Sequence, residues 1–172
     1  MFQNCSNLTS LDLSHFDTSK VTDFRYMFNG CSNLETLNLS NWDMNLNTYE
    51  SRQVFTGTSK LRTITARNLK VSSNKGFSLF THSDSSYLLS SSNYNNGLNS
   101  NIHLDLSNPI MTTTSLYNAL SYIPVKTIDL TGLNTSNVTN MSGMFKGFPN
   151  LTASHLNDLD TSKVTNMSYM FQ

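Results

Sequence analysis

The sequence is poor in charge, proline, tryptophan and cysteine. Only 13% of its 172 residues are charged, and the formal net charge at pH 7 is zero. A neutral chain offers no electrostatic basis for binding DNA, RNA or an anionic membrane. The sequence also contains no apolar run long enough to span a bilayer and no recognisable signal peptide. We therefore expect no nucleic-acid partner and no direct membrane insertion.

Motifs for catalysis and for metal binding are missing as well. No two of the four histidines have the spacing H-x-x-x-H, and no glycine-rich phosphate loop occurs. Serine is so abundant that a Ser-His-Asp combination carries no information. Calcium needs six to eight oxygen ligands, and no loop gathers them around Asp12, Asp105 or Asp129. We predict that the chain is not an enzyme and has no cofactor and no essential metal.

The two cysteines, Cys5 and Cys31, lie 26 residues apart in similar surroundings. The first interpretation is that both are buried thiols that pack as small apolar groups. The second is a disulfide that joins neighbouring repeats. Equivalent positions hold Thr58, Leu120 and Phe148, which favours packing. Without a nearby pair of histidines, a zinc site is not expected.

What the sequence does have is an internal repeat and much serine, threonine and asparagine, which together make up roughly two-fifths of the chain. The segment MFQNCSNLTSLDLSHFDTSKVTDFRY starts at Met1, and close copies start at Met27 and Met144. The chain ends on a further MFQ at Met170. A constant period in this range is typical of a solenoid, in which each copy stacks on its neighbours.

Each repeat contains a strand pattern and a helical pattern. Leu8, Leu11 and Leu13 follow the spacing L-x-x-L-x-L, whose alternation predicts a short strand with one buried face. Its backbone needs partners in the adjacent repeats, so we expect a parallel sheet. The turn residues of FDTS follow. Phe24 and Phe28 then lie at helical spacing, which predicts a short helical or 3-10 segment on the opposite side.

Stacking would place equivalent apolar residues in columns along the solenoid. The expected columns follow Leu8 (Leu34, Leu61, Val125, Leu151), Leu13 (Leu39, Ala66, Leu106, Leu130, Leu156) and Phe16 (Trp42, Leu69, Pro109, Leu133, Leu159).

We predict one domain over residues 1–172, divided into about six repeats at 1–26, 27–53, 54–79, 80–115, 116–143 and 144–169. Their strands are expected near 8–14, 34–40, 61–67, 102–107, 125–131 and 151–157. The fourth repeat is about ten residues too long, and the excess lies in a Ser/Asn-rich insertion at 82–101.

The segment LDLSHFDTSKVTDFRYMFNGCSNL resembles the BspA-type leucine-rich repeats of bacterial surface proteins, in the variant that carries FDTSxVTxMxxMFxxCxxL. The match is strong at residues 1–43 and 125–172 and weak between about 44 and 124. The resemblance implies a right-handed leucine-rich-repeat solenoid and an extracellular, cell-surface location. Because the chain begins and ends in the same repeat register, we expect a fragment of a longer array, with the anchor outside it. It also implies adhesion to an extracellular host or matrix protein, a mucin or a glycan.

Two surfaces are candidates for partner binding. The outward strand positions form a polar, hydroxyl-rich face without an aromatic row, which suits weak and repeated contacts. Its candidate binding residues are Asp12, Asn38, Thr65, Arg67, His103, Asp105, Thr127, Asp129 and His155. The second surface is the insertion 82–101, where Tyr87 and Tyr94 provide aromatic anchors. The alternative function is a passive structural spacer in a surface protein.

Overall fold

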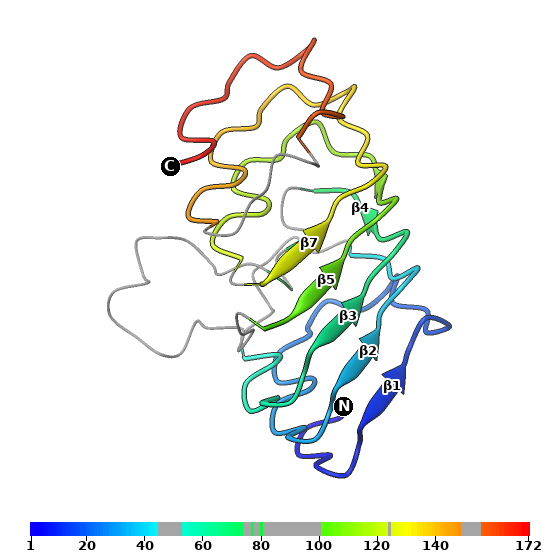
Figure 1. The fold of residues 1–172 in the computed structure, drawn as a ribbon. Helices are drawn as coiled ribbons and strands as arrows, with labels where there is room; N and C mark the ends of the chain where they lie inside the picture. Colours follow the sequence, from blue (N-terminus) through cyan, green and yellow to red (C-terminus); the bar gives the residue numbers. More distant parts are fainter. Residues whose placement is uncertain (45–52, 74–76, 78–79, 81–100, 124, 149–155) are drawn as a thin grey trace.

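The structure is a computed structural model, and it describes residues 1–44, 53–73, 77, 80, 101–123, 125–148 and 156–172. Two parallel sheets form its framework (Figure 1). The larger sheet has the order β1-β2-β3-β5-β7. Its strands are β1 (Ser10–Asp12), β2 (Thr36–Asn38), β3 (Thr63–Thr65), β5 (His103–Asp105) and β7 (Thr127–Asp129). The smaller sheet pairs β4 (Lys70–Val71) with β6 (Ile110–Met111).

The register of the large sheet follows the sequence repeat. Leu11 pairs with Leu37, Leu37 with Ile64, Ile64 with Leu104, and Leu104 with Ile128. All five strands lie within the ranges that the L-x-x-L-x-L pattern predicts, so this part of the prediction is confirmed. Most of the sixth expected strand, at 151–157, lies outside the described residues. The parallel sheet is consistent with a leucine-rich-repeat-like fold.

The predicted helical segments are wrong: no helix occurs among the described residues. The segment around Phe28 is a series of turns, although Phe24 and Phe28 are both buried as expected. The physical reason lies in the backbone hydrogen bonds. The amide of Phe28 donates to the carbonyl of Val54 in the next repeat at 3.0 Å. The equivalent bond, from the amide of Phe2 to the carbonyl of Met27, is 2.9 Å long. Amides that bond between repeats are not available for bonds to the fourth residue before them.

The interior contains the expected columns of apolar side chains. Leu37, Phe28 and Leu130 are all buried, as the sequence predicts. Aromatic rings stack from repeat to repeat: the ring centroids of Phe2 and Phe28 are 5.9 Å apart, and those of Phe28 and Phe55 are 5.8 Å apart. Leu8, Leu156 and Leu159 are only partly buried, and Phe16 departs furthest from the expected burial, because 44% of its surface is exposed. It lies in the first repeat, which has a described neighbour on one side only.

Both cysteines are free thiols, in agreement with the packing interpretation. Cys31 is buried and its thiol donates to the carbonyl oxygen of Phe2, with Sγ and O 3.0 Å apart. Burial raises the pKa of the Cys31 thiol, because it disfavours the charged thiolate.

Candidate functional site

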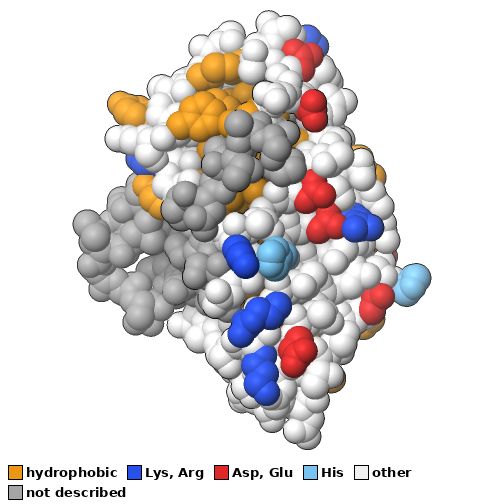
Figure 2. Space-filling view, in the orientation of Figure 1, with side chains coloured by type: hydrophobic (Ala, Val, Ile, Leu, Met, Phe, Trp, Pro, Cys, Tyr) orange, Lys and Arg blue, Asp and Glu red, His pale blue; other side chains and the backbone are white. Residues whose placement is uncertain are grey.

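The outward face of the large sheet carries two rows of polar side chains. The alternation of each strand places a buried residue, such as Leu104, between two outward ones, His103 and Asp105. Figure 2 shows charged side chains scattered over the sheet side of the molecule, among backbone and side chains that are neither charged nor hydrophobic. The five-stranded sheet therefore presents a broad polar surface, as the sequence predicts.

The carboxyl end of most strands is closed by the same side-chain turn. The Oδ1 atom of Asp12 accepts the amide of Ser14 at 2.9 Å, and Asp129 accepts the amide of Thr131 at 2.9 Å. Asn38 accepts both the amide and the hydroxyl of Ser40. These are Asx turns, in which a short polar side chain bonds to the backbone two residues later.

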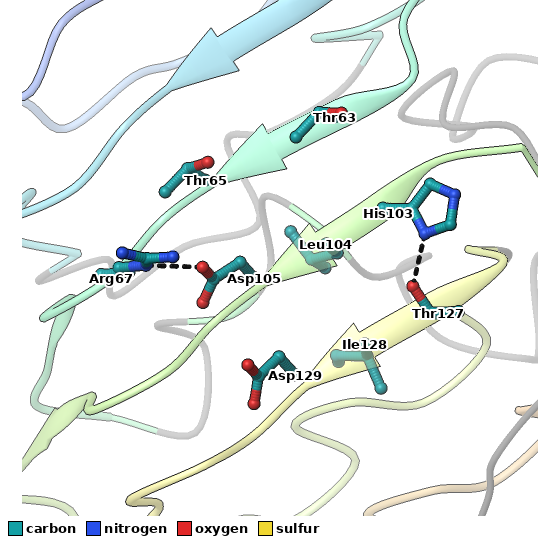
Figure 3. Close-up of a pocket in the computed structure, with 9 residues that line it drawn as sticks. All are labelled: Thr63, Thr65, Arg67, His103, Leu104, Asp105, Thr127, Ile128 and Asp129. Carbon is teal, nitrogen blue, oxygen red and sulfur yellow. Dashed lines mark hydrogen bonds and ion pairs between the residues drawn. The ribbon is translucent and has the colours of Figure 1, made fainter.

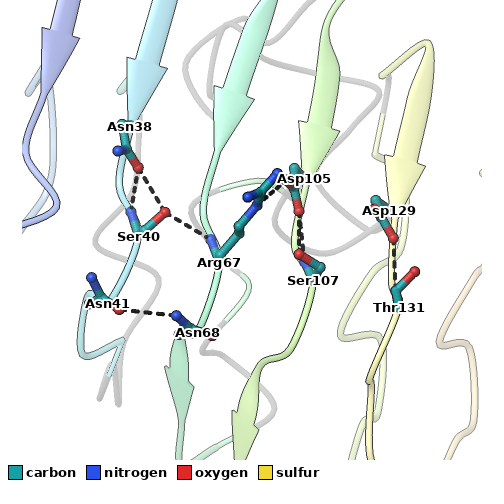
Figure 4. A network of polar contacts seen from close by, with 9 residues as sticks. All are labelled: Asn38, Ser40, Asn41, Arg67, Asn68, Asp105, Ser107, Asp129 and Thr131. Carbon is teal, nitrogen blue, oxygen red and sulfur yellow. Dashed lines mark hydrogen bonds and ion pairs between the residues drawn. The ribbon is translucent and has the colours of Figure 1, made fainter.

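The third residue after the end of β2, β3, β5 and β7 holds a left-handed backbone conformation. The φ angles are 67° at Asn41, 55° at Asn68, 55° at Asn108 and 76° at Gly132. Asparagine and glycine are the residues that adopt this conformation at least cost. The side-chain Nδ2 of Asn68 also donates to Oδ1 of Asn41 at 3.2 Å (Figure 4). The abundance of Asn, Asp, Ser and Thr thus has a structural use in the turns.

The third repeat breaks this pattern. Thr65 stands where its neighbours have Asp or Asn, and Arg67 stands where they have Ser or Thr. Arg67 instead reaches across to the next strand, and its Nε donates to Oδ2 of Asp105 at 2.6 Å. The backbone amide of Arg67 donates to the hydroxyl oxygen of Ser40 at 3.2 Å. A cross-strand ion pair replaces the local turn (Figure 4).

The ionisation of Asp105 reflects this arrangement. Burial opposes its ionisation, but hydrogen bonds from Ser107 and the ion pair with Arg67 outweigh burial and lower its pKa. Asp12 also has a lowered pKa, chiefly because the backbone and side chain of Ser14 donate hydrogen bonds to it. Both groups are therefore carboxylates at neutral pH.

A shallow hollow lies over β3, β5 and β7, with a volume of about 430 Å³. Its lining is drawn in Figure 3: Thr63, Thr65, Arg67, His103, Leu104, Asp105, Thr127, Ile128 and Asp129. The Nδ1 atom of His103 is hydrogen-bonded to the hydroxyl of Thr127 at 2.8 Å. The floor is aliphatic and the rim carries a cation, two carboxylates, an imidazole and hydroxyl groups.

The structure brings together six of the candidate residues in this hollow: Thr65, Arg67, His103, Asp105, Thr127 and Asp129. Asn38 and Asp12 lie on the same face, on β2 and β1. His155, Tyr87 and Tyr94 lie outside the described residues.

Sequence reasoning missed two features of this face. One is the Asx turn, which the pattern [D/N]-x-[S/T] at the ends of β1, β2, β5 and β7 could have indicated. The other is the pairing of Arg67 with Asp105, which are 38 residues apart and separated by the long fourth repeat. Lys70, another basic residue of the third repeat, lies on β4 in the other sheet.

Among the described residues, no three His, Cys, Asp or Glu side chains are grouped in a way that could hold a metal ion. In the same part of the chain, no helix has the length and apolar character needed to cross a membrane.

The fold and this face define a repeat protein built on a parallel sheet. Residues 1–96 and 114–172 match the family described as Mycoplasma protein of unknown function, DUF285, and the chain belongs to that family. A search of curated proteins and a search of solved structures found no match.

Proposed function

We propose that this chain is a non-catalytic interaction module of the BspA-type leucine-rich-repeat class, displayed on the outside of a bacterial cell. The motif FDTSKVTDF and the 26-residue period support this assignment, together with a repeat family and a parallel sheet in register with the period. The repeats continue one into the next as a right-handed solenoid, since parallel strand crossovers are right-handed in nearly all proteins.

The binding surface in this proposal is the polar sheet face, centred on the hollow over β3, β5 and β7. The observation that supports it most directly is the collection of different polar groups at one hollow. Arg67 can donate hydrogen bonds, Asp129 can accept them, and the hydroxyl groups of Thr63 and Thr65 can do both. The hollow is open and shallow, so it suits part of an extended chain better than a small enclosed molecule.

The partner in this proposal is an extracellular host or matrix protein, a mucin or a glycan. No aromatic ring of Phe, Tyr or Trp lines the described hollow, and such rings are the usual anchors of tight interfaces. A single contact is therefore weak. Strength comes from many copies on one cell surface that engage a repetitive polymer together.

The test is a binding screen of the chain, immobilised at high density, against matrix proteins, mucin and glycans. We expect Thr127→Arg together with Asp129→Arg to abolish binding, because two long cations fill the hollow and reverse its charge. Thr112→Arg is the matched control, since Thr112 is exposed and lies outside the hollow. A third variant lacks residues 82–101.

Each result of the screen separates the alternatives. Loss of binding in the hollow variant alone supports the sheet face as the site. Loss of binding only on deletion of 82–101 moves the site to the insertion. Absence of binding to every partner at high density contradicts the proposal and favours the alternative, a passive spacer.

A further inference from the structure

The hollow over β3, β5 and β7 contains more negative than positive side chains. Its lining includes two carboxylates, Asp105 and Asp129, and a single guanidinium, that of Arg67. We propose that this hollow binds a lysine or arginine side chain of an extended protein segment, with the side-chain cation at Asp129. The proposal rests on the function proposed above, and it selects a protein with basic residues as the partner in place of a mucin or a glycan.

Arg67 compensates one of the two carboxylates and leaves the other. Its Nε donates to Oδ2 of Asp105 at 2.6 Å, and no ion pair joins Asp129 to a described residue. Oδ1 of Asp129 accepts the backbone amide of Thr131 at 2.9 Å, and none of the described residues donates to Oδ2. One oxygen of the Asp129 carboxylate is therefore available to a cation from a partner.

The two carboxylates also lie next to each other. Asp105 on β5 is paired in register with Asp129 on β7, and both side chains line the same hollow. Neighbouring strands are about 4.8 Å apart, and like charges directly opposite each other destabilise a sheet. Figure 3 shows Arg67, Asp105 and Asp129 together at the carboxyl ends of the three strands. A second cation beside Asp129 offsets the repulsion between the carboxylates, which favours binding.

Two further cations lie at the opposite ends of these strands. Arg62 immediately precedes β3, and Lys126 immediately precedes β7. Lys126 is three residues before Asp129 in the sequence, which corresponds to about 10 Å of extended backbone. The guanidinium of Arg62 donates to the carbonyls of Ser59 and Leu61. Basic and acidic groups are thus separated along the strands, and a partner's cation is favoured at the carboxyl end.

The rest of the lining suits the other parts of a protein segment. Leu104 and Ile128 form an aliphatic floor on which the methylene groups of a lysine can pack. The hydroxyl groups of Thr63 and Thr65 make no hydrogen bond with the described residues. Each can donate to a peptide carbonyl and accept from a peptide amide. Neutral and acidic sugars contain no cation, so a basic protein segment matches the charge of the hollow better.

The experiment titrates the 172-residue chain, labelled with nitrogen-15, with short blocked peptides at neutral pH and low salt. The first peptide is acetyl-Gly-Ser-Lys-Ser-Gly-amide, and two analogues have glutamine or glutamate in place of the lysine. We expect the lysine peptide to shift the amide resonances of Ile128 and Thr131, the glutamine peptide to shift them much less, and the glutamate peptide to leave them unchanged. Added salt should weaken the binding of the lysine peptide.

Two substitutions in the hollow should change the affinity in opposite directions. Asp129→Asn removes the charge and keeps a side-chain oxygen for the amide of Thr131, and Asn38 makes the equivalent bond. This variant should bind the lysine peptide about three- to tenfold more weakly. Arg67→Gln removes the competing cation, so it should bind the same peptide more tightly by a similar factor.

Asp17→Asn is the matched control. Asp17 is exposed, and its Oδ1 accepts the backbone amide of Ser19 in a turn of the same kind, but it lies outside the hollow. The substitution removes the same charge from the chain and should leave the affinity for the lysine peptide unchanged. Circular dichroism shows whether each variant is folded. If Asp129→Asn is not, the gain in affinity of Arg67→Gln tests the proposal.

Three results would overturn the proposal: equal binding of the lysine and glutamine peptides, an unchanged affinity in folded Asp129→Asn, or a lower affinity in Arg67→Gln. Its failure can be told apart from failure of the proposed function. Binding of a mucin or a glycan that is lost with Thr127→Arg and Asp129→Arg, without binding of the lysine peptide, overturns this proposal and leaves the proposed function intact. Absence of every partner from the screen contradicts the proposed function instead.

Discussion

The first repeat and the second have nearly the same sequence pattern but different environments. Phe16 and Trp42 occupy equivalent positions, yet Phe16 is 44% exposed and Trp42 is 0% exposed. Leu11 is half-buried, whereas its partner Leu37 is buried. The second repeat has neighbours on both sides and the first has a described neighbour on one side only. Burial in this protein is therefore a property of the stack and not of the single repeat.

The polar face shows the same dependence on neighbours. Asp12 in the first repeat bonds within its own turn, while Asp105 in an inner repeat also pairs with Arg67 on the preceding strand of the sheet. Equivalent carboxylates thus differ in their contacts because the adjacent repeat differs. Three sets of variants test how far neighbouring repeats, and not the local sequence, determine what a residue contributes to stability.

The largest expected effect is that of Trp42→Ala. Trp42 is fully buried, stacks on Phe24 with ring centroids 5.4 Å apart and donates from Nε1 to the carbonyl of Leu13 at 2.9 Å. Removing a buried aromatic side chain costs about 3–5 kcal/mol. Phe16→Ala should cost only about 1 kcal/mol, because much of that ring is already in water. Urea denaturation of both variants measures the difference, and equal losses would contradict the comparison.

An intermediate effect is expected for Asp105→Asn. Asparagine occupies the equivalent position 38 and bonds to Ser40 there, so the variant should keep its bonds to Ser107 and lose the ion pair with Arg67. We expect a loss of about 0.5–1 kcal/mol at neutral pH. Asp12→Asn, in the first repeat, should lose less because Asp12 has no described ion pair.

The same variant tests the pH dependence. The pKa of Asp105 is lowered in the folded protein, so its stabilising contribution is full above the ordinary carboxyl pKa of about 4 and is lost as pH falls below it. Thermal melts at pH 7 and at lower pH should show that the unaltered chain loses more stability on acidification than Asp105→Asn does. An identical decline in both would show that Asp105 does not contribute.

The smallest expected effect is that of the double substitution Thr65→Asn and Arg67→Ser, which gives the third repeat the turn of the second. The Asx turn replaces an ion pair in which the Arg67 side chain is 60% exposed, and an exposed pair contributes about 0–1 kcal/mol. The net change should be within about 0.5 kcal/mol. Melts at low and high salt should show that the unaltered chain is sensitive to salt and the variant less so.

The sequence by itself determined the strands and the interior columns. A period of 26 residues and the spacing of leucines are local patterns, and the strand alternation follows from the geometry of an extended backbone. The outward positions of Asp105, Asp129 and Thr127 follow from the same alternation. These features could be predicted because they depend on residues close together in the chain.

Only the tertiary structure decided the rest. The spacing of Phe24 and Phe28 fits a helix, but the amide of Phe28 bonds to Val54 in the next repeat, and the segment is a series of turns. The ion pair of Arg67 with Asp105 depends on β3 and β5 being neighbours across the long fourth repeat. The exposure of Phe16 depends on the absence of a described repeat on its outer side. In each case the deciding contact comes from another repeat, and a pattern within one repeat carries no information about it.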